Sequence, residues 1–467
     1  MSDDGGDRTA FRHLGRKRRT KEDIRFVKGQ GRYVADINLP GMLHLALLTS
    51  PHPSALITAT EAADALATDG VAAVLFGDEL AAATAPLMNA VDTPNVACYP
   101  LAAGEVRYAG EWVAAVAATS RHIAEDAVEL LGVDYQPRPF VLDAEAALDP
   151  GSPPVHAAHG GNVLYRHTFN WGDVDGGFRT AAHQLAFRAA WGRSATVPIE
   201  TFGVVAQWHD AQGLLEIWAS IQMPSYPEQI AAALHLPVNA VRVHYDVDVG
   251  GSYGVKRGIK HTVLAGYLAR KLGRPVRLIE DRLENMIGGD AHGPERLFDV
   301  EVAFGDDGLI AALRLRALED VGAHTGRAPF QLGKPVGAIV GPYTIGAVRY
   351  EAICVSTNKT GQIAVRGFGQ SPTNFALETA IDKVARHLGR DRLEVRKRNF
   401  IRKEQFPYRI PSGSEYDSGD YRTVLDKAVE LADLPELLAR RDELREQGLL
   451  AGIGIATCLE PGGGNSS

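Results

Sequence analysis

The sequence predicts an α+β fold built from two consecutive domains. Apolar runs of strand length alternate with segments whose apolar residues recur at helical spacing, and turns rich in glycine and proline separate them. The chain has 467 residues, of which 45% are hydrophobic and 23% are charged. Because single hydrophobic cores stop growing at about 250–300 residues, a chain of this length and composition should form two or more domains.

The two predicted domains are separated by a short linker. We expect an N-terminal arm over residues 1–22, a first domain over 23–145, a linker over 146–161 and a second domain over 162–467. The linker is rich in proline, glycine and alanine, which is typical of a domain boundary. The arm carries one dense basic run that acidic residues follow at once, and such a run is most often a solvated arm.

The first domain shows an alternation of strand and helix signals. Residues 112–118 form an apolar run of strand length. Thr119 or Ser120 can cap a helix after this run, and Gly132 is predicted to stop that helix. Strand-like sequence resumes at Val133, so the domain is predicted to be a small mixed sheet with helices.

The second domain contains a helix whose end is marked in sequence. Its apolar positions end at Leu272, Gly273 occupies the C-terminal cap position, and Pro275 prevents continuation of the helix. Further along, residues 305–308 read Gly-Asp-Asp-Gly between two strand-like runs, which predicts a hairpin. This domain is therefore also predicted to be α+β.

Composition excludes several function classes. The net charge of -8 provides no basic field for nucleic acid. No apolar stretch reaches the roughly 20 residues of a membrane span, and the N-terminus lacks the apolar core of a secretory signal, so we expect a cytoplasmic protein. The three cysteines, Cys98, Cys354 and Cys458, lack the spacing of an iron-sulfur or structural zinc site. Any electron-transfer centre is therefore expected on another chain.

Three loops between regular elements carry residues that can bind a ligand. The first, at residues 221–224, is a predicted strand end with an amide side chain directly before a helix. The second is rich in glycine. The third places an arginine and an aromatic ring before a helix with Ser371 as N-cap and Pro372 at its first position. In chain order their candidate residues are Gln222; Gly250, Gly251, Ser252, Tyr253 and Gly254; and Arg366, Gly367 and Phe368.

Each loop also has a purely structural interpretation. A glycine-rich loop can be a tight turn, a phenylalanine in a loop can belong to a satellite core, and a glutamine before a helix can cap it. The glycine loop matches neither a Walker loop nor a dinucleotide fingerprint, because the required spacings are missing. No single loop decides between ligand binding and structure.

Taken together and in order, the motifs resemble the molybdopterin-binding large subunit of the xanthine dehydrogenase and aldehyde oxidase family. The resemblance runs through nearly the whole chain and implies a hammerhead-type α/β domain followed by the first molybdopterin-binding domain. Besides the three loops, it is carried by Lys28 to Ile37, Ser50-Pro51-His52, Tyr108-Ala109-Gly110-Glu111, Pro198-Ile199-Glu200, Ile279-Glu280-Asp281-Arg282 and Tyr416 to Tyr421.

The resemblance assigns roles to the three loops. Gln222 is implied to hydrogen-bond a molybdenum oxygen, residues 250–254 to face the metal with backbone amides, and Phe368 to pack on a substrate ring. Arg366 and Gly367 belong to the same cofactor-binding loop, and Gln222, Arg366 and Phe368 are the predicted catalytic set. The metal itself is implied to be held through the pterin dithiolene of a cytosine dinucleotide cofactor, with no direct protein ligand.

Departures from the family pattern narrow the substrate. The usual Gly-Gly-Gly-Phe-Gly motif is replaced here by residues 250–254, which keep the amides and add two hydroxyl groups. Arg257 stands where purine oxidisers of the family carry a substrate-binding glutamate, so xanthine is disfavoured. The loop at Arg366 lacks the cysteine that carbon monoxide dehydrogenases place there, so carbon monoxide is disfavoured too. A nitrogen heteroaromatic or an aldehyde remains.

The end of the sequence suggests that the catalytic unit needs further parts. A final strand is predicted at 452–456, a glycine loop follows at 462–464, and the second molybdopterin-binding domain would start here. The resemblance therefore implies a partner that supplies the other half of the cofactor site, as in nicotinate dehydrogenases, and partner subunits that carry FAD and [2Fe-2S] clusters.

Two alternatives stay open at this stage. The chain could be a fragment of one longer catalytic polypeptide, or it could be a scaffold or binding protein that keeps the fold without molybdenum chemistry. Retention of Gln222, Arg366 and Phe368 in separate loops favours an enzyme over a scaffold, because a scaffold gains nothing from three site residues.

Overall fold

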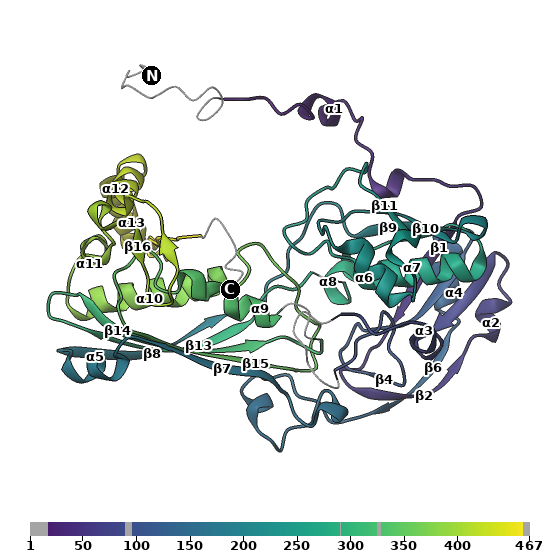
Figure 1. Cartoon of the computed structure of the whole chain (residues 1–467), viewed down its shortest axis with the longest axis horizontal. Coiled ribbons are helices and arrows are strands. Elements are labelled where there is room, and N and C mark those ends of the chain that lie inside the picture. The colour runs from purple at the N-terminus through teal and green to yellow at the C-terminus, as the bar shows by residue number, and fades with distance from the viewer. Residues whose placement is uncertain (1–16, 89–95, 290, 325–327, 461–467) are drawn as a thin grey trace.

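The computed structural model describes residues 17–88, 96–289, 291–324 and 328–460 (Figure 1). It contains two bodies, one built on a seven-stranded and a three-stranded sheet and the other on a five-stranded sheet. Both bodies carry helices, which confirms the predicted α+β class. Across these described ranges, no helix is long and apolar enough to cross a membrane.

The seven-stranded sheet combines strands from both sides of the predicted linker. Its order is β11-β10-β9-β12-β1-β5-β3, and a parallel pairing of Leu43 with Val276 joins β1 to β12. The two predicted domains therefore share one sheet, because an early strand finds a hydrogen-bond partner about 230 residues later. The strands are β1 Leu43–Thr49, β3 Val71–Phe76, β5 Trp112–Ala118, β9 Gly203–His209, β10 Leu214–Ala219, β11 Val241–His244 and β12 Val276–Ile279.

The central strand β5 is buried along its whole length. Its alternate side chains point to opposite faces of the sheet: Ala115 and Ala117 join one apolar cluster, and Val116 and Ala118 join another. Helices cover the two faces, which explains the uninterrupted apolar sequence. Those that pack near this sheet are α2 Ala63–Leu66, α3 Gly77–Ala83, α4 Arg121–Val128, α6 Tyr226–Ala233 and α7 Ile259–Leu272.

The cap predictions for this body are confirmed in two cases and wrong in one. Ser120 caps α4 by accepting a hydrogen bond from the backbone of the third helical residue. Gly273 ends α7 in the left-handed region, with φ of 60°. Gly132 does not stop α4, which already ends at Val128; it is the first residue of β6 and pairs with β2. Gly132 was expected to end the helix, but it takes part in strand pairing instead.

The predicted linker packs between the two bodies. Ala147 and Val155 are buried in one cluster with Tyr108 of the first body and with Leu318 and Ile353 of the five-stranded sheet. The segment thus contributes apolar contacts as well as a connection.

The five-stranded sheet has the order β7-β15-β14-β13-β8. Its central hairpin, β13 to β14, is the one predicted from the Gly-Asp-Asp-Gly turn, and Gly308 adopts the positive φ of 85° that the turn requires. The hairpin prediction is confirmed. The strands are β7 Val163–Trp171, β8 His183–Trp191, β13 Arg296–Phe304, β14 Ile310–Asp320 and β15 Val348–Val355.

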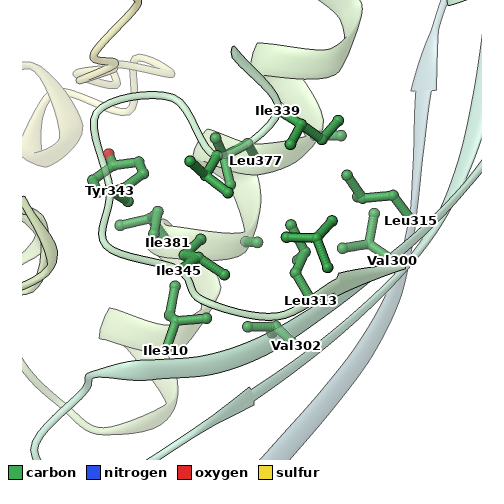
Figure 2. Close-up of a cluster of buried hydrophobic side chains, with 14 of the residues drawn as sticks. Val300, Val302, Ile310, Leu313, Leu315, Ile339, Tyr343, Ile345, Leu377 and Ile381 are labelled. Carbon is green, nitrogen blue, oxygen red and sulfur yellow. The ribbon is translucent and has the colours of Figure 1, made fainter. Parts of the chain in front are cut away.

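Helix α10, Gln370–His387, packs against this sheet and forms the core of the second body (Figure 2). Apolar side chains from the sheet meet those of α10 and of the segment before β15. The labelled members are Val300, Val302, Ile310, Leu313, Leu315, Ile339, Tyr343, Ile345, Leu377 and Ile381.

The remaining elements are short or lie on the outside of the two bodies. They are α1 Asp23–Val27, α5 Val174–Thr180, α8 Arg282–Ile287, α9 Ala328–Gly333, α11 Arg392–Asn399, α12 Tyr421–Leu431, α13 Leu434–Glu446, β2 Ala55–Glu61, β4 Glu105–Val106, β6 Gly132–Pro137, β16 Tyr408–Arg409 and β17 Glu415–Tyr416.

The strand predicted at 452–456 is wrong, because this segment pairs with no other strand in the described part of the chain. Arginine side chains bind its backbone in place of a neighbouring strand. Arg392 donates to the carbonyl of Ile453 at 3.1 Å, and Arg396 donates to that of Ile455 at 2.9 Å. The glycine loop predicted at 462–464 lies outside the described residues.

Truncating the core of the second body should destabilise it markedly. Leu377 is only 2% exposed, so Leu377→Ala should lower the free energy of unfolding by about 2–5 kcal/mol. Leu431 is 76% exposed, and Leu431→Ala should change that free energy by less than about 0.5 kcal/mol. Chemical denaturation of both variants checks the prediction, and equal losses would contradict it.

Candidate functional site

The structure brings the three predicted loops into direct contact. The backbone N–H of Gly254 donates to Oε1 of Gln222 at 3.1 Å, which joins the first loop to the second. The backbone N–H of Arg366 donates to the carbonyl of Tyr253 at 2.7 Å, which joins the second loop to the third. The third loop lies between β15 and α10 of the second body, so the three loops meet where the two bodies adjoin.

Gln222 lies in the loop that leads into α6. Strand β10 ends at Ala219, three residues earlier than the predicted strand end. The side chain does not cap α6, because α6 has no side-chain cap and Oε1 binds Gly254. Because the carbonyl oxygen is used in this way, the Nε2 group is the part of the exposed amide that can donate to a ligand.

The glycine loop depends on backbone conformations that side chains rarely adopt. Gly251 and Gly254 have φ of 92° and 108°, and Tyr253 between them has φ of 58°. A Cβ atom at Gly254 would lie 2.3 Å from the carbonyl oxygen of Ala364. Glycine is therefore required at 254, and the strained Tyr253 is typical of a functional loop.

A partly buried ion pair fixes the base of the glycine loop. Glu200 accepts a hydrogen bond from the backbone N–H of Gly250 at 2.7 Å and pairs with the ammonium group of Lys256. Lys256 is 1% exposed, and burial lowers its pKa. Near this base, the buried hydroxyl group of Ser252 has no hydrogen-bond partner among the described residues. This hydroxyl group can therefore make a further hydrogen bond.

The Arg366 loop enters α10 through three left-handed residues. Gly367, Phe368 and Gly369 have φ of 96°, 45° and 84°. The predicted cap is wrong: Gly369, not Ser371, precedes the first residue of α10, and no side chain caps the helix. The left-handed turn starts the helix earlier than the serine-proline signal indicates. Arg366 is exposed and Phe368 is half-buried.

Arg296 supports this loop and was not singled out from the sequence. It is fully buried, pairs with Glu319, and donates to the carbonyls of Gly369 and Gln331, each at 3.2 Å. A local signal for it exists: Arg296 occupies an inward-facing position of β13, on the same face as Phe298. A charge at an inward position of an alternating strand indicates a buried partner.

A cavity of about 320 Å³ lies beside the three loops. Three of its lining residues lie close to the loops in sequence. Ser225 is three residues after Gln222, and Arg257 is three residues after Gly254. Ile363 is three residues before Arg366. The predicted site residues themselves are not part of the lining. The lining also includes Cys98, Tyr99, Tyr108 and Glu111 of the first body, and His324.

The cavity wall contains a buried ion pair between His324 and Glu111. Nε2 of the imidazole lies 3.0 Å from Oε1 of Glu111. Burial by itself would lower the pKa of His324, but the adjacent Cys98 and Glu111 groups raise it to about 10. Burial also opposes ionisation of Glu111, yet the pKa of its carboxyl group is lowered, chiefly by His324. Both groups are therefore charged at neutral pH.

The comparisons with known proteins identify the family of the chain. Residues 155–400 match the family model of the molybdopterin cofactor-binding domain, and residues 28–139 match that of the a/b hammerhead domain of aldehyde oxidase and xanthine dehydrogenase. The chain belongs to this family. The family resemblance inferred from the motifs is confirmed, as is the order of a hammerhead domain followed by a molybdopterin-binding domain.

Relatives in this family differ in length from the chain. The carbon monoxide dehydrogenase large chain of Hydrogenophaga pseudoflava is 35% identical, over 96% of this chain and 58% of that protein. The crystal structure of quinoline 2-oxidoreductase from Pseudomonas putida 86 has a TM-score of 0.84 and 36% identity, over 92% of this chain and 55% of that one. The nicotinate dehydrogenase large molybdopterin subunit of Eubacterium barkeri is 26% identical, over 83% of this chain and 89% of that protein. The chain thus spans just over half the length of the first two.

The described residues contain no group of three or more histidine, cysteine, aspartate and glutamate side chains that could hold a metal ion. The three loops provide a different donor set, made of backbone amides, one side-chain amide, one hydroxyl group and one guanidinium group. This set suits the oxygen atoms of a bound group better than it suits a bare cation.

A side chain at Gly254 should separate the loops. Gly254→Ala would place its Cβ atom 2.3 Å from the carbonyl oxygen of Ala364. Gly213→Ala is the control, because Gly213 also has a positive φ, of 60°, but has open space around it. The loss of unfolding free energy for Gly254→Ala should exceed that of the control by about 1–3 kcal/mol. Thermal unfolding tests this, and similar losses would count against the close contact.

The His324–Glu111 pair predicts how stability depends on pH. Because the pKa of His324 is raised, its protonation contributes fully to the free energy of unfolding below pH 6.5. This contribution is lost as the pH rises towards about 10. The lowered pKa of Glu111 stabilises the fold above 4.5, and this contribution is lost at lower pH. Glu111→Gln should therefore lower the free energy of unfolding most between pH 4.5 and 6.5, and less at pH 9. Thermal unfolding of both proteins across this range checks it; a difference that grows with rising pH would refute it.

Proposed function

We propose that this chain is part of the molybdenum catalytic unit of a hydroxylating dehydrogenase. The unit inserts a water-derived oxygen into an electrophilic C–H bond of a nitrogen heteroaromatic or an aldehyde, and the electrons leave through iron-sulfur and flavin partners. The observation that carries the proposal is the hydrogen bond from Gly254 to Oε1 of Gln222, which orients the Nε2 donor of Gln222 at the meeting point of the loops.

The residues at this point fit a molybdopterin cofactor. Gln222 offers its side-chain amide, residues 250–254 offer backbone N–H groups, and Ser252 offers a buried hydroxyl without a partner. Arg366 adds an exposed positive charge for an anionic cofactor, and Gly367 allows close approach of the backbone beside it. When bound, the molybdenum cofactor, which we expect in the cytosine dinucleotide form, supplies the oxygen-transfer and two-electron redox chemistry.

The chain's own residues then bind and orient. The Nε2 group of Gln222 donates a hydrogen bond to an oxygen at the reacting centre, which stabilises negative charge as it develops there. The half-buried ring of Phe368 stacks on a flat substrate and aligns the carbon that is attacked. The rigid glycine loop keeps its amides in place without reorganisation during the reaction.

The loop sequences favour a heteroaromatic substrate. Phe368 provides an aromatic contact surface, and no cysteine stands between Arg366 and Gly369, which disfavours carbon monoxide despite the 35% identity to a carbon monoxide dehydrogenase chain. The solved relative at 36% identity is a quinoline oxidoreductase, which supports a ring nitrogen compound. Arg257 in the cavity wall continues to disfavour xanthine.

The complete enzyme is proposed to be heteromeric. A further molybdopterin-binding segment would complete the cofactor site. Cys354 is buried and Cys458 is exposed, and neither belongs to a metal-binding group within the described ranges. Two electrons therefore need FAD and [2Fe-2S] clusters on other subunits. Metal, iron and flavin analysis of the complex copurified through this chain tests its composition.

Two substitutions separate the proposed roles. Gln222→Ala should chiefly lower kcat, by about a hundredfold, because one such donor contributes on the order of 3 kcal/mol to the transition state. Phe368→Ala should raise KM for an aromatic substrate by about threefold to tenfold, because a stacking contact is worth about 0.5–1.5 kcal/mol. Both are measured by steady-state kinetics normalised to bound molybdenum, with unchanged molybdenum content expected for Phe368→Ala.

Thermal melting of each complex is the control. If both variants melt earlier than wild type yet keep their activity per bound molybdenum, the two residues serve packing and capping, and the assignment of the site fails. A wild-type complex that binds no molybdenum would instead favour the non-catalytic scaffold.

A further inference from the structure

The three cysteines of this chain lie in different surroundings. Cys354 is buried, and burial raises the pKa of its thiol well above the usual value. Cys458 is exposed, yet burial of part of its side chain and the nearby carboxylates of Glu460 and Glu378 raise the pKa of its thiol. Because the thiolate is the nucleophile, both are poor nucleophiles at neutral pH. Cys98 differs from them: it is partly exposed and lines the cavity.

Cys98 lies beside a positively charged imidazole. Its thiol and the ring of His324 share a side-chain hydrogen bond. Burial lowers the pKa of His324, but Cys98 and, after it, Glu111 raise that pKa to about 10, so the ring is a cation at neutral pH. The thiol also has a contact of 3.9 Å with the carbonyl of Tyr99, which is long and holds it weakly. A cation next to a cysteine favours the thiolate form.

Glu111 orients the imidazole from the other side. Its Oε1 lies 3.0 Å from Nε2 of His324, and its Oε2 accepts a hydrogen bond from the backbone N–H of Arg107. The ring of Tyr108 lies edge-on to that of His324, at 5.9 Å between centroids, and limits its rotation. A thiol, an imidazole and a carboxylate that orients the imidazole form the arrangement that activates a nucleophilic cysteine.

We propose that Cys98 is a modification site of this chain, at which the sulfur, held beside the imidazolium of His324, is oxidised by hydroperoxides that enter the cavity. With hydrogen peroxide, the thiolate sulfur attacks one oxygen, an S–O bond forms as the O–O bond breaks, and the leaving hydroxide takes a proton from solvent to become water. The sulfur loses two electrons and becomes a sulfenic acid, and the peroxide gains them. A cavity of about 320 Å³ admits so small an oxidant.

This proposal does not depend on the proposed function. The three groups, Cys98, His324 and Glu111, all belong to this chain, and the reaction needs neither molybdenum nor a heteroaromatic substrate. Its failure and that of the proposed function are therefore separate results.

Site-resolved alkylation of the complex purified through this chain is the first test. Iodoacetamide is applied at pH 7.0, the reaction is quenched at short times, and mass spectrometry of the digest gives a rate for each cysteine. Cys98 should react at least about tenfold faster than Cys458, because an ordinary cysteine is only a few per cent thiolate at this pH. Exposure alone predicts the opposite order, so an equal or faster reaction at Cys458 would overturn the proposal.

A matched pair of variants separates the charge of His324 from its packing. His324→Gln keeps a polar side chain but removes the charge, and it should lower the alkylation rate at Cys98 by about tenfold without changing the rate at Cys458. His156→Gln is the control, because the ring of His156 lies 5.9 Å from that of His324 but burial lowers its pKa to about 3, so it is neutral. This control should react as wild type does.

A rate at Cys98 that is unchanged or higher in His324→Gln, or an equal loss in both variants, would show that the charge of the imidazole does not activate the thiol. If His324→Gln melts much earlier than wild type, Glu111→Gln takes its place. It keeps an oxygen that can accept from the backbone of Arg107, and it should lower the rate at Cys98 in the same direction.

Oxidation itself is followed with dimedone, which traps sulfenic acids covalently. After brief treatment with hydrogen peroxide, wild type should carry the label on Cys98 and not on Cys354 or Cys458, and Cys98→Ser should carry none. Neither label nor a sulfinic product at Cys98 would overturn the proposal. Label at Cys98 in a complex that hydroxylates no heteroaromatic compound would leave this site standing while the hydroxylase proposal fails.

Discussion

The hydrogen bond from the backbone of Arg366 to the carbonyl of Tyr253 is the interaction on which the candidate site depends. It joins a loop of the second body to the glycine loop of the first, and Gly254 then binds Gln222 from the other side. Without this bond the third loop, from the second body, would not be joined to the other two loops. A Cβ atom at Gly254 would lie only 2.3 Å from the carbonyl oxygen of Ala364, which shows how closely the two backbones approach.

Such an approach requires both bodies to be held in place, and the structure achieves this at several points. The predicted linker packs in an apolar cluster between them. Within the first body, β1 pairs with the distant strand β12, and within the second body Arg296 donates to the carbonyl of Gly369, directly before α10. Backbone strain at Tyr253 and Phe368, at about 1–3 kcal/mol for each residue, is tolerated because these contacts determine the loop conformation.

Buried and partly buried charge pairs recur around the site: Lys256 with Glu200, Arg296 with Glu319, and His324 with Glu111. Such pairs contribute little net stability, because removing two charges from water offsets most of their attraction. Their effect here is geometric: the first fixes the glycine loop, the second fixes the entrance of α10, and the third sets a positive charge in the cavity wall. These charge pairs are therefore better explained by the positions in which they hold the loops and the cavity wall than by a gain in stability.

The sequence alone determined the features whose signals lie within a few residues. The cap at Ser120, the end of α7 at Gly273, the hairpin at Gly308 and the motifs of the three loops were all readable, because capping and turn conformation depend on neighbouring residues. Tertiary structure decided the rest. Gly132 entered a strand, the segment at 452–456 was bound by arginines, and Glu111 met His324 across 213 positions of sequence. These outcomes depend on which distant backbone or charge is available, and no local pattern encodes that choice.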